Sequence, residues 1–302
     1  MALSVRKFQL ALAYLALAAP GGLGLHTTPT MEKSALRAPS SYWLRRGDSQ
    51  RIHYAKVDGQ AVSGSSSPKP VLLLNGFGVG WFHWERTMRP LAEETGATVF
   101  AMDYLGQGDS WPVDCDDGNA PSEQGLRYSI DDWFDQTVEF IEAVVLPSAS
   151  SKGEQGGQKV ALVGNSLGGL LASVIAARRP DLVASLALLN AAPLWGGNLP
   201  GWDARLPGPA LPRLVGRFMY DQIRAPGAIR DLLARTYSDA SKLGALPEEI
   251  RRVTDESEGG HAAFASILWA RPASIPKAPK VPKVAAADGE AADGEAADGE
   301  AA

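Results

Sequence analysis

Short apolar runs recur along the chain up to about residue 190, and each of them ends at a polar or glycine-rich turn. The runs cover residues 71–74, 97–102, 159–163 and 182–189. Continuous apolar segments of this length are typical of strands buried on both faces of a parallel sheet. Residues 42–57 predict two further short strands around a turn at residues 46–48.

Helical patterns alternate with these strands. Residues 130–145 carry apolar side chains at positions 130, 133, 134, 138, 141 and 145, which form one stripe along a helix. Helices are also predicted over residues 81–94 and 167–179. Alternating strands and helices indicate a doubly wound, mostly parallel sheet. The predicted fold class is therefore α/β, with a core over residues 40–192.

The alternation stops after this core. Residues 193–271 are rich in Pro, Gly and Trp, and they contain short helical stretches at 211–222, 228–236 and 247–256. A helical cap inserted after a strand of the sheet would have this pattern. We therefore expect these residues to form a cap rather than further strands.

The two ends of the chain have their own compositions. Residues 1–31 contain no Asp or Glu, and Arg6 and Lys7 precede an apolar run at 8–19 that is too short to span a membrane. Together with the basic stretch that follows, this layout predicts a targeting leader over residues 1–39, directed to a plastid, with secretion as the alternative. Residues 272–302 contain three copies of Ala-Ala-Asp-Gly-Glu and are expected to be disordered, because they lack large apolar side chains.

Composition narrows the possible partners. The formal net charge is −5 and no basic stripe is present, which argues against a nucleic-acid partner. Cys115 is the only cysteine, so an internal disulfide is excluded. The sequence indicates no cofactor and no metal site.

The strongest chemical signal is the pentapeptide Gly164-Asn165-Ser166-Leu167-Gly168, which lies between an apolar strand and a helix. In a G-x-S-x-G turn with this setting, the tight strand–helix corner exposes the serine hydroxyl above the sheet. Ser166 is therefore the predicted nucleophile. The backbone N–H of Leu167, at the start of the helix, is a predicted oxyanion donor. The alternative is a glycine-rich turn without chemistry.

Two more glycine-rich turns follow predicted strands. Residues 75–80 (Asn-Gly-Phe-Gly-Val-Gly) follow one strand, and the backbone N–H of Phe77 is the predicted second oxyanion donor. A phosphate-binding loop is the alternative, but the spacing is not G-x-G-x-x-G. Asp103 begins the other turn, residues 103–110. We expect Asp103 to hold its own loop by hydrogen bonds rather than to act as a catalytic acid.

These motifs resemble those of α/β hydrolases over about residues 42–270, and more narrowly those of the pheophytinase and chlorophyll dephytylase family of plastids. The segment 188–196, Leu-Leu-Asn-Ala-Ala-Pro-Leu-Trp-Gly, matches as well. The resemblance implies a serine hydrolase that cleaves a carboxylic ester, the phytyl ester of pheophytin or chlorophyll, with a histidine and an acid assisting Ser166. Trp81 and Trp195 would wall an apolar site for this hydrophobic substrate, and ordinary packing is the alternative.

The remainder of a catalytic triad is not recognised. The chain order in this fold is Ser, acid, His, and His261 is the only histidine after Ser166. We do not favour His261 as the base, because it is predicted to enter a cap helix, and the acids Asp255, Glu256 and Glu258 lack a strand that would position them. The sequence therefore predicts an α/β-hydrolase fold truncated at its C-terminal end, with one sheet edge open. A non-catalytic pigment or lipid binding protein and a general lipase or esterase are the alternative functions.

Overall fold

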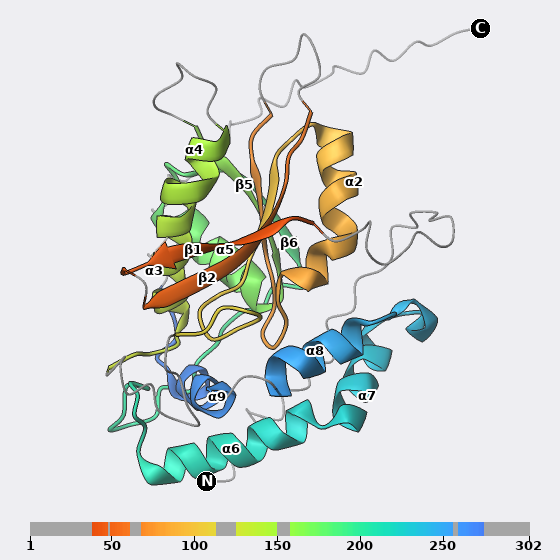
Figure 1. The fold of residues 1–302 in the computed structure, drawn as a ribbon. Coiled ribbons are helices and arrows are strands. Elements are labelled where there is room, and N and C mark those ends of the chain that lie inside the picture. Colours follow the sequence, from red (N-terminus) through yellow and green to blue (C-terminus); the bar gives the residue numbers. More distant parts are fainter. Residues whose placement is uncertain are drawn as a thin grey trace, which may run out of the picture.

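A twisted sheet with the strand order β1-β2-β4-β3-β5-β6 forms the centre of the molecule (Figure 1). The computed structural model describes residues 38–47, 49–60, 68–112, 125–149, 158–255 and 259–274. The predicted leader up to residue 37 and the predicted tail from residue 275 lie outside the described residues, as do Cys115, Glu256 and Glu258.

The sheet combines one antiparallel edge with a parallel body. The strands are β1 (Ser40–Arg45), β2 (Gln50–Val57), β3 (Val71–Leu74), β4 (Val99–Met102), β5 (Val160–Asn165) and β6 (Val183–Leu189). The β1–β2 and β2–β4 pairs are antiparallel, whereas β4, β3, β5 and β6 run parallel to one another. The mostly parallel α/β sheet expected from the sequence is therefore confirmed.

Helices cover both faces of this sheet. The core helices are η1 (Trp81–Trp84), α2 (Glu85–Thr95), α3 (Ile130–Phe140), the π-helical η3 (Ile141–Val145), α4 (Leu146–Ala149) and α5 (Leu167–Arg178). Leu72 and Leu74 of β3 pack with residues of α3 and α5, whereas Leu73 packs on the other face with residues of α2. This alternation buries every residue of β3, as the apolar run predicts.

The predicted cap is a layer of helices at the lower end of the sheet in Figure 1. Its helices are α6 (Ala210–Arg224), α7 (Pro226–Thr236), the 3-10 turn η4 (Ala240–Lys242), α8 (Leu246–Asp255) and α9 (Gly260–Trp269). The described ranges include no helix that is both long and apolar enough to cross a bilayer.

Strand β6 differs from its prediction. The apolar run at residues 182–189 predicts a strand buried on both faces, but most of β6 is exposed, and Leu188 keeps 46% of its surface in contact with solvent. In the described part of the chain, β6 pairs with β5 alone and forms an edge of the sheet. The prediction of burial is wrong because burial depends on neighbouring elements, which the apolar character of a strand does not supply.

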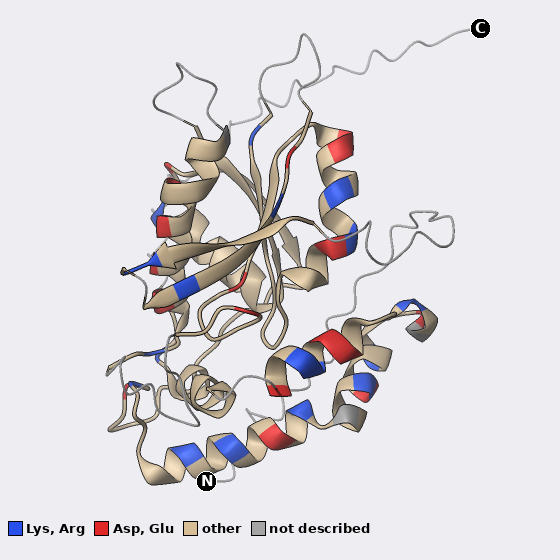
Figure 2. Cartoon of the chain, viewed as in Figure 1, with Lys and Arg blue, Asp and Glu red and all other residues tan. Residues whose placement is uncertain are grey.

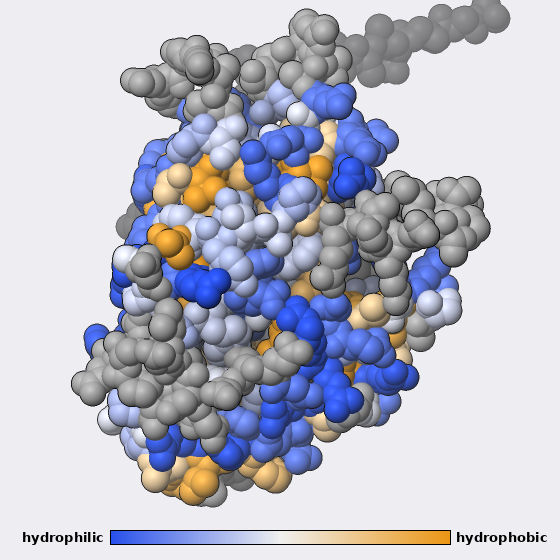
Figure 3. Space-filling model, in the orientation of Figure 1, coloured by the Kyte–Doolittle hydropathy of each residue, from blue (hydrophilic) through white to orange (hydrophobic). Residues whose placement is uncertain are grey.

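Charged and apolar side chains are unevenly distributed over the surface. Lys, Arg, Asp and Glu are interspersed along the cap helices (Figure 2). Apolar surface gathers at the lower end of the molecule in the orientation of Figure 1, where α6 lies (Figure 3). The large apolar side chains that α6 exposes are Leu211, Leu214, Val215 and Phe218.

The close approach of α5 to the sheet leads to a test of stability. A Cβ added at Gly168 would lie 2.2 Å from the carbonyl oxygen of Leu74, so helix and strand would have to separate. We expect Gly168→Ala to lower the free energy of unfolding by about 1–3 kcal/mol, measured by urea denaturation. Gly227→Ala on α7 is the matched control, because a Cβ there meets nothing within 4 Å. Equal stability of the two variants would contradict the packing described here.

Candidate active site

Ser166 occupies a strained corner between β5 and α5. Its backbone has φ 51° and ψ −116°, a conformation that is costly for a residue with a side chain. Hydrogen bonds of the backbone hold this corner in place. Ser166 N donates to Leu189 O at 3.0 Å, and Ser166 O accepts from the N–H groups of Gly169, Leu170 and Ala192. The geometry is that of a nucleophile elbow, which presents a hydroxyl at the carboxyl end of a strand.

The loop after β3 lies directly beside this serine. A Cβ added at Gly76 would be 3.3 Å from Ser166 Cβ and 3.7 Å from Ser166 Oγ. The side chain of Asn75 braces the loop, because its Nδ2 donates to Val79 O at 2.8 Å. Gly78 N donates to Gln107 Oε1 at 2.7 Å, which ties the loop to the neighbouring turn. The loop that carries Phe77 and the first turn of α5 therefore flank the Ser166 hydroxyl.

This arrangement is compatible with two oxyanion donors. Leu167 is the first residue of α5, and Phe77 follows Gly76 in the flanking loop. An oxyanion hole needs backbone N–H groups that are fixed before the reaction begins. The roles of Phe77 and Leu167 as donors stay predictions, and the bracing of both segments is what favours them.

Asp103 supports the turns around the site. Its carboxylate is fully buried and accepts hydrogen bonds from Trp81 N at 2.6 Å and from Asp109 N at 3.0 Å. His53 Nδ1 lies 3.0 Å from Asp103 Oδ2. Burial raises the pKa of Asp103, although the hydrogen bond from His53 opposes this effect. These contacts favour the structural interpretation over that of a catalytic acid.

The donor atoms around Asp103 are close enough together to be compared with a metal site. Ligand atoms of His53, Asp103 and Asp109 all lie within 4.8 Å of one another. Arg252, however, forms an ion pair with Asp109 at 2.8 Å and places a positive charge against the group. The carboxylate of Asp103 is also used by backbone donors. The donor set therefore fits a hydrogen-bonded support better than a cation site.

His261 lies on a helix of the cap layer. It lies in the first turn of α9, and its Nε2 is 2.8 Å from Asp221 Oδ1 on α6. Burial of Asp221 raises its pKa, but hydrogen bonds from His261 and Arg224 outweigh burial, so the pKa is lowered overall. His53 and His261 each have a carboxylate partner, Asp103 for His53 and Asp221 for His261.

An apolar cavity of about 180 Å³ lies between the cap and the loop that carries Phe77. Trp195 and Phe77 both line it, with their rings stacked at a centroid distance of 6.0 Å. Trp195 Nε1 donates to Ile267 O at 3.1 Å, so its polar atom is satisfied within the protein. The cap contributes residues of all four of its α-helices, including Tyr220, Leu233, Ile250 and Phe264.

Trp81 is placed differently from Trp195. It is 5% exposed and lies in the core cluster with Met88 and Val99. It is not among the residues that line the apolar cavity. The structure therefore favours packing for Trp81 and the cavity for Trp195. The two His–Asp pairs, His53–Asp103 and His261–Asp221, were not predicted from the sequence, because each joins segments at least 40 residues apart.

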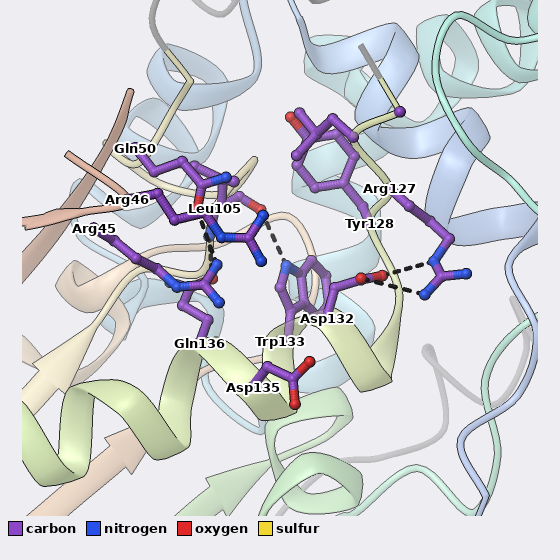
Figure 4. A pocket seen from close by; sticks show the side chains of 12 residues that line it. Arg45, Arg46, Gln50, Leu105, Arg127, Tyr128, Asp132, Trp133, Asp135 and Gln136 are labelled. Atoms are coloured by element: carbon purple, nitrogen blue, oxygen red, sulfur yellow. Dashed lines mark hydrogen bonds and ion pairs between the residues drawn. The ribbon is translucent and has the colours of Figure 1, made fainter. Parts of the chain in front are cut away.

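A smaller cavity of about 80 Å³ lies between the β1–β2 turn and α3 (Figure 4). Charged side chains line it, and three of them, Arg45, Arg127 and Asp132, form ion pairs. Arg45 Nε lies 2.6 Å from Glu139 Oε2, and Arg127 Nε lies 2.9 Å from Asp132 Oδ2. Ser166 and the Phe77 loop are not part of its lining. We interpret this cavity as part of the ion-pair network that attaches α3 to the sheet edge.

Comparisons with known proteins give the family. The chain belongs to the alpha/beta hydrolase fold family, whose sequence profile matches residues 69–273. It is 31% identical over 252 residues to the chloroplastic pheophytinase of Arabidopsis thaliana, covering 73% of this chain and 48% of that protein. It is 28% identical over 179 residues to a 2-hydroxymuconate semialdehyde hydrolase of Pseudomonas, covering 57% of this chain and 54% of that protein.

A solved structure supports the fold independently. The crystal structure of a probable hydrolytic enzyme from Pseudomonas aeruginosa superposes with a TM-score of 0.51 at 21% identity, covering 76% of this chain and 65% of that chain. The family profile and the match to the Arabidopsis thaliana protein confirm the sequence resemblance to α/β hydrolases and to pheophytinase. The chain spans about half the length of the curated relatives that it matches.

His83 lies on η1, just after the glycine-rich loop at residues 75–80, and it generates a prediction about acid stability. Burial lowers the pKa of His83 to about 4, below its ordinary 6.5. As the pH falls from about 6.5 to 4, the unfolded chain binds a proton that the folded chain does not, so the folded state loses up to about 3 kcal/mol in this window. We expect His83→Phe to reduce this loss, measured as the difference in unfolding free energy between pH 7 and pH 4.5. An unchanged difference would show that His83 is not the titrating group.

Proposed function

We propose that this protein is a serine hydrolase of the pheophytinase type, which cleaves the ester between a long apolar alcohol and a carboxylate. The observation that carries the proposal is the strained conformation of Ser166 at the end of β5, directly beside the glycine-rich loop. The apolar cavity, which Phe77 of that loop also lines, has the character needed to hold a chlorin ring or a phytyl chain. The phytyl ester of pheophytin or chlorophyll is therefore the proposed substrate.

The chemistry would be acyl transfer. Ser166 Oγ would attack the ester carbonyl carbon while a base removes its proton, and the N–H groups of Phe77 and Leu167 would hold the negative oxygen. The proton would pass to the departing alcohol, and water would then release the acyl group from Ser166. His261 follows Ser166 in the chain order of this fold, but its hydrogen bond to Asp221 holds it in the cap.

A second candidate function is the binding of a pigment or lipid without hydrolysis. The observation that favours it is the hydrogen bond between His261 Nε2 and Asp221 Oδ1, which engages this histidine within the cap. Binding requires only the cavity, whereas acyl transfer also requires a base. A general lipase or esterase would use the same residues with a different ester.

We also propose a plastid as the site of action. The composition of residues 1–39 is that of a targeting leader. The similarity to a pheophytinase that is chloroplastic in Arabidopsis thaliana supports the same destination.

Labelling with a fluorophosphonate probe tests the proposed nucleophile. We expect the folded chain to react at Ser166, and Ser166→Ala to abolish labelling together with hydrolysis of pheophytin. Removing such a nucleophile lowers the rate by about a thousandfold or more. A His261→Ala variant belongs in the same experiment, because loss of labelling there identifies His261 as the base.

The outcomes of this experiment separate the candidate functions. Absence of labelling, combined with tight pheophytin binding, would contradict the hydrolase and favour the binding protein. Faster hydrolysis of short p-nitrophenyl esters than of pheophytin would favour the general esterase.

The cavity is tested separately through Trp195. We expect Trp195→Ala to weaken pheophytin binding by about tenfold, because it removes a large apolar wall from the cavity. The measurement is a fluorescence titration of the variant proteins. Trp202→Ala is the matched control, because that indole donates to Arg205 O at 2.8 Å and does not line the cavity. Equal affinities of the two variants would place the ligand elsewhere.

A further inference from the structure

Helix α6 carries an apolar stripe that points to solvent. Leu211, Leu214, Val215 and Phe218 are spaced i, i+3, i+4 and i+7, which places them on one face of the helix. Leu211 is 72% exposed, Leu214 64% and Phe218 67%. Such a stripe normally packs into a core, so its exposure over two turns is a costly feature that needs a partner.

The opposite face of α6 already has its own packing. Gly216 faces Ala265 of α9 so closely that a Cβ would lie 2.6 Å from the Ala265 Cβ. Tyr220 is buried, and Tyr220 and Ile223 line the apolar cavity. The exposed stripe is therefore not a displaced core face, because the helix packs against the protein through its other side.

The charges on α6 identify the kind of partner. The helix carries three arginines, at positions 213, 217 and 224, and a single acid, Asp221. Arg224 forms ion pairs with Asp221 and Asp255 within the cap, so the basic character of the outer part of the helix comes from Arg213 and Arg217. Figure 2 shows basic bands along this helix, and Figure 3 shows apolar surface at the same end of the molecule. A helix with an apolar face and basic residues on its polar side lies in the interface of a bilayer that contains anionic head groups.

We infer that α6 is a membrane-docking helix, whose face of Leu211, Leu214, Val215 and Phe218 inserts into the surface of a bilayer that contains anionic lipid. At 15 residues, α6 is suited to lying in the plane of the interface and is too short to span the bilayer. The position of α6 relates this docking to the apolar cavity, because the helix lies next to α7 at the cavity wall. Leu232 of the adjacent α7 lines the cavity and is also 37% exposed, so this part of the cavity wall borders the surface of the cap.

The inference goes beyond the proposed function and does not require ester hydrolysis. It rests on the exposed stripe and the charges of α6, and the cavity adds the expectation that an apolar ligand passes from the bilayer into the protein. A failure of Ser166 to react would leave it intact, because vesicle binding is measured without any reaction.

The test is flotation of the full chain with phosphatidylcholine vesicles that contain or lack phosphatidylglycerol. We expect the wild-type chain to float with the anionic vesicles, and the triple variant Leu211→Ser, Leu214→Ser, Phe218→Ser to bind at least about a hundredfold more weakly, because each substitution removes an inserted apolar side chain. Higher salt should weaken binding by the wild-type chain. Arg213→Gln with Arg217→Gln should lose the preference for anionic vesicles and keep residual binding.

A matched control tests whether vesicle binding depends on α6 in particular or on exposed leucines anywhere on the surface. Leu44 and Leu188 are also exposed, on β1 and β6 of the sheet, and Leu44→Ser with Leu188→Ser should bind vesicles as the wild type does. All variants keep residues 1–39, so any membrane affinity of the apolar run at 8–19 is common to them and cancels in the comparison. Thermal unfolding confirms that each variant is folded.

Three results would overturn the inference. The first is a wild-type chain that does not float with either kind of vesicle. The second is a triple variant that floats as well as the wild type. The third is a wild-type chain that forms dimers in sedimentation experiments, stays in solution beside vesicles and becomes monomeric in the triple variant, which would assign the stripe to a protein interface.

Discussion

The contact between the first turn of α5 and the sheet is the constraint on which the rest of the site depends. A Cβ at Gly164 would lie 2.4 Å from Gly168 O, and a Cβ at Gly168 would lie 2.2 Å from Leu74 O. Only glycine allows backbones to approach this closely. The short distance leaves the chain a single residue in which to turn from strand to helix. Ser166 takes that turn and adopts a strained conformation that exposes its hydroxyl.

Buried polar side chains fix the turns next to Ser166 through hydrogen bonds. Asp103 and Asn75 are both fully buried, and their hydrogen bonds go to the backbone of segments that flank the site. A buried carboxylate is tolerated only when donors surround it, and here Trp81 N, Asp109 N and His53 provide them. The loop beside Ser166 is therefore fixed before any ligand arrives, which an oxyanion hole requires.

The sequence allowed the prediction of features that depend on local pattern. The apolar runs and helical stripes predicted the strands and helices, and the G-x-S-x-G motif predicted the turn at Ser166. Features that depend on distant neighbours could not be predicted. The apolar run of β6 does not reveal its exposure, which depends on the elements that cover the strand, although the resemblance to α/β hydrolases led us to expect one open sheet edge. The pairing of His261 with Asp221 depends on how α6 and α9 pack together. Trp81 and Trp195 both lie close to a recognised motif, so the sequence does not distinguish them. Only the packing shows that Trp81 lies in the core and that Trp195 lines the cavity.

The cap gives the two candidate functions different physical requirements. His261 is held by Asp221, which is also bound to Arg224, so bringing this histidine to Ser166 would break a charge-assisted pair within the cap. Binding of an apolar ligand in the cavity requires no such rearrangement, because the lining of the cavity does not depend on a base. Helix α6 would serve either function, since its inner face lines the cavity and its outer face exposes a second apolar stripe. Capture of an apolar ligand is thus the step that both functions share, and the supply of a base to Ser166 decides whether capture leads to hydrolysis.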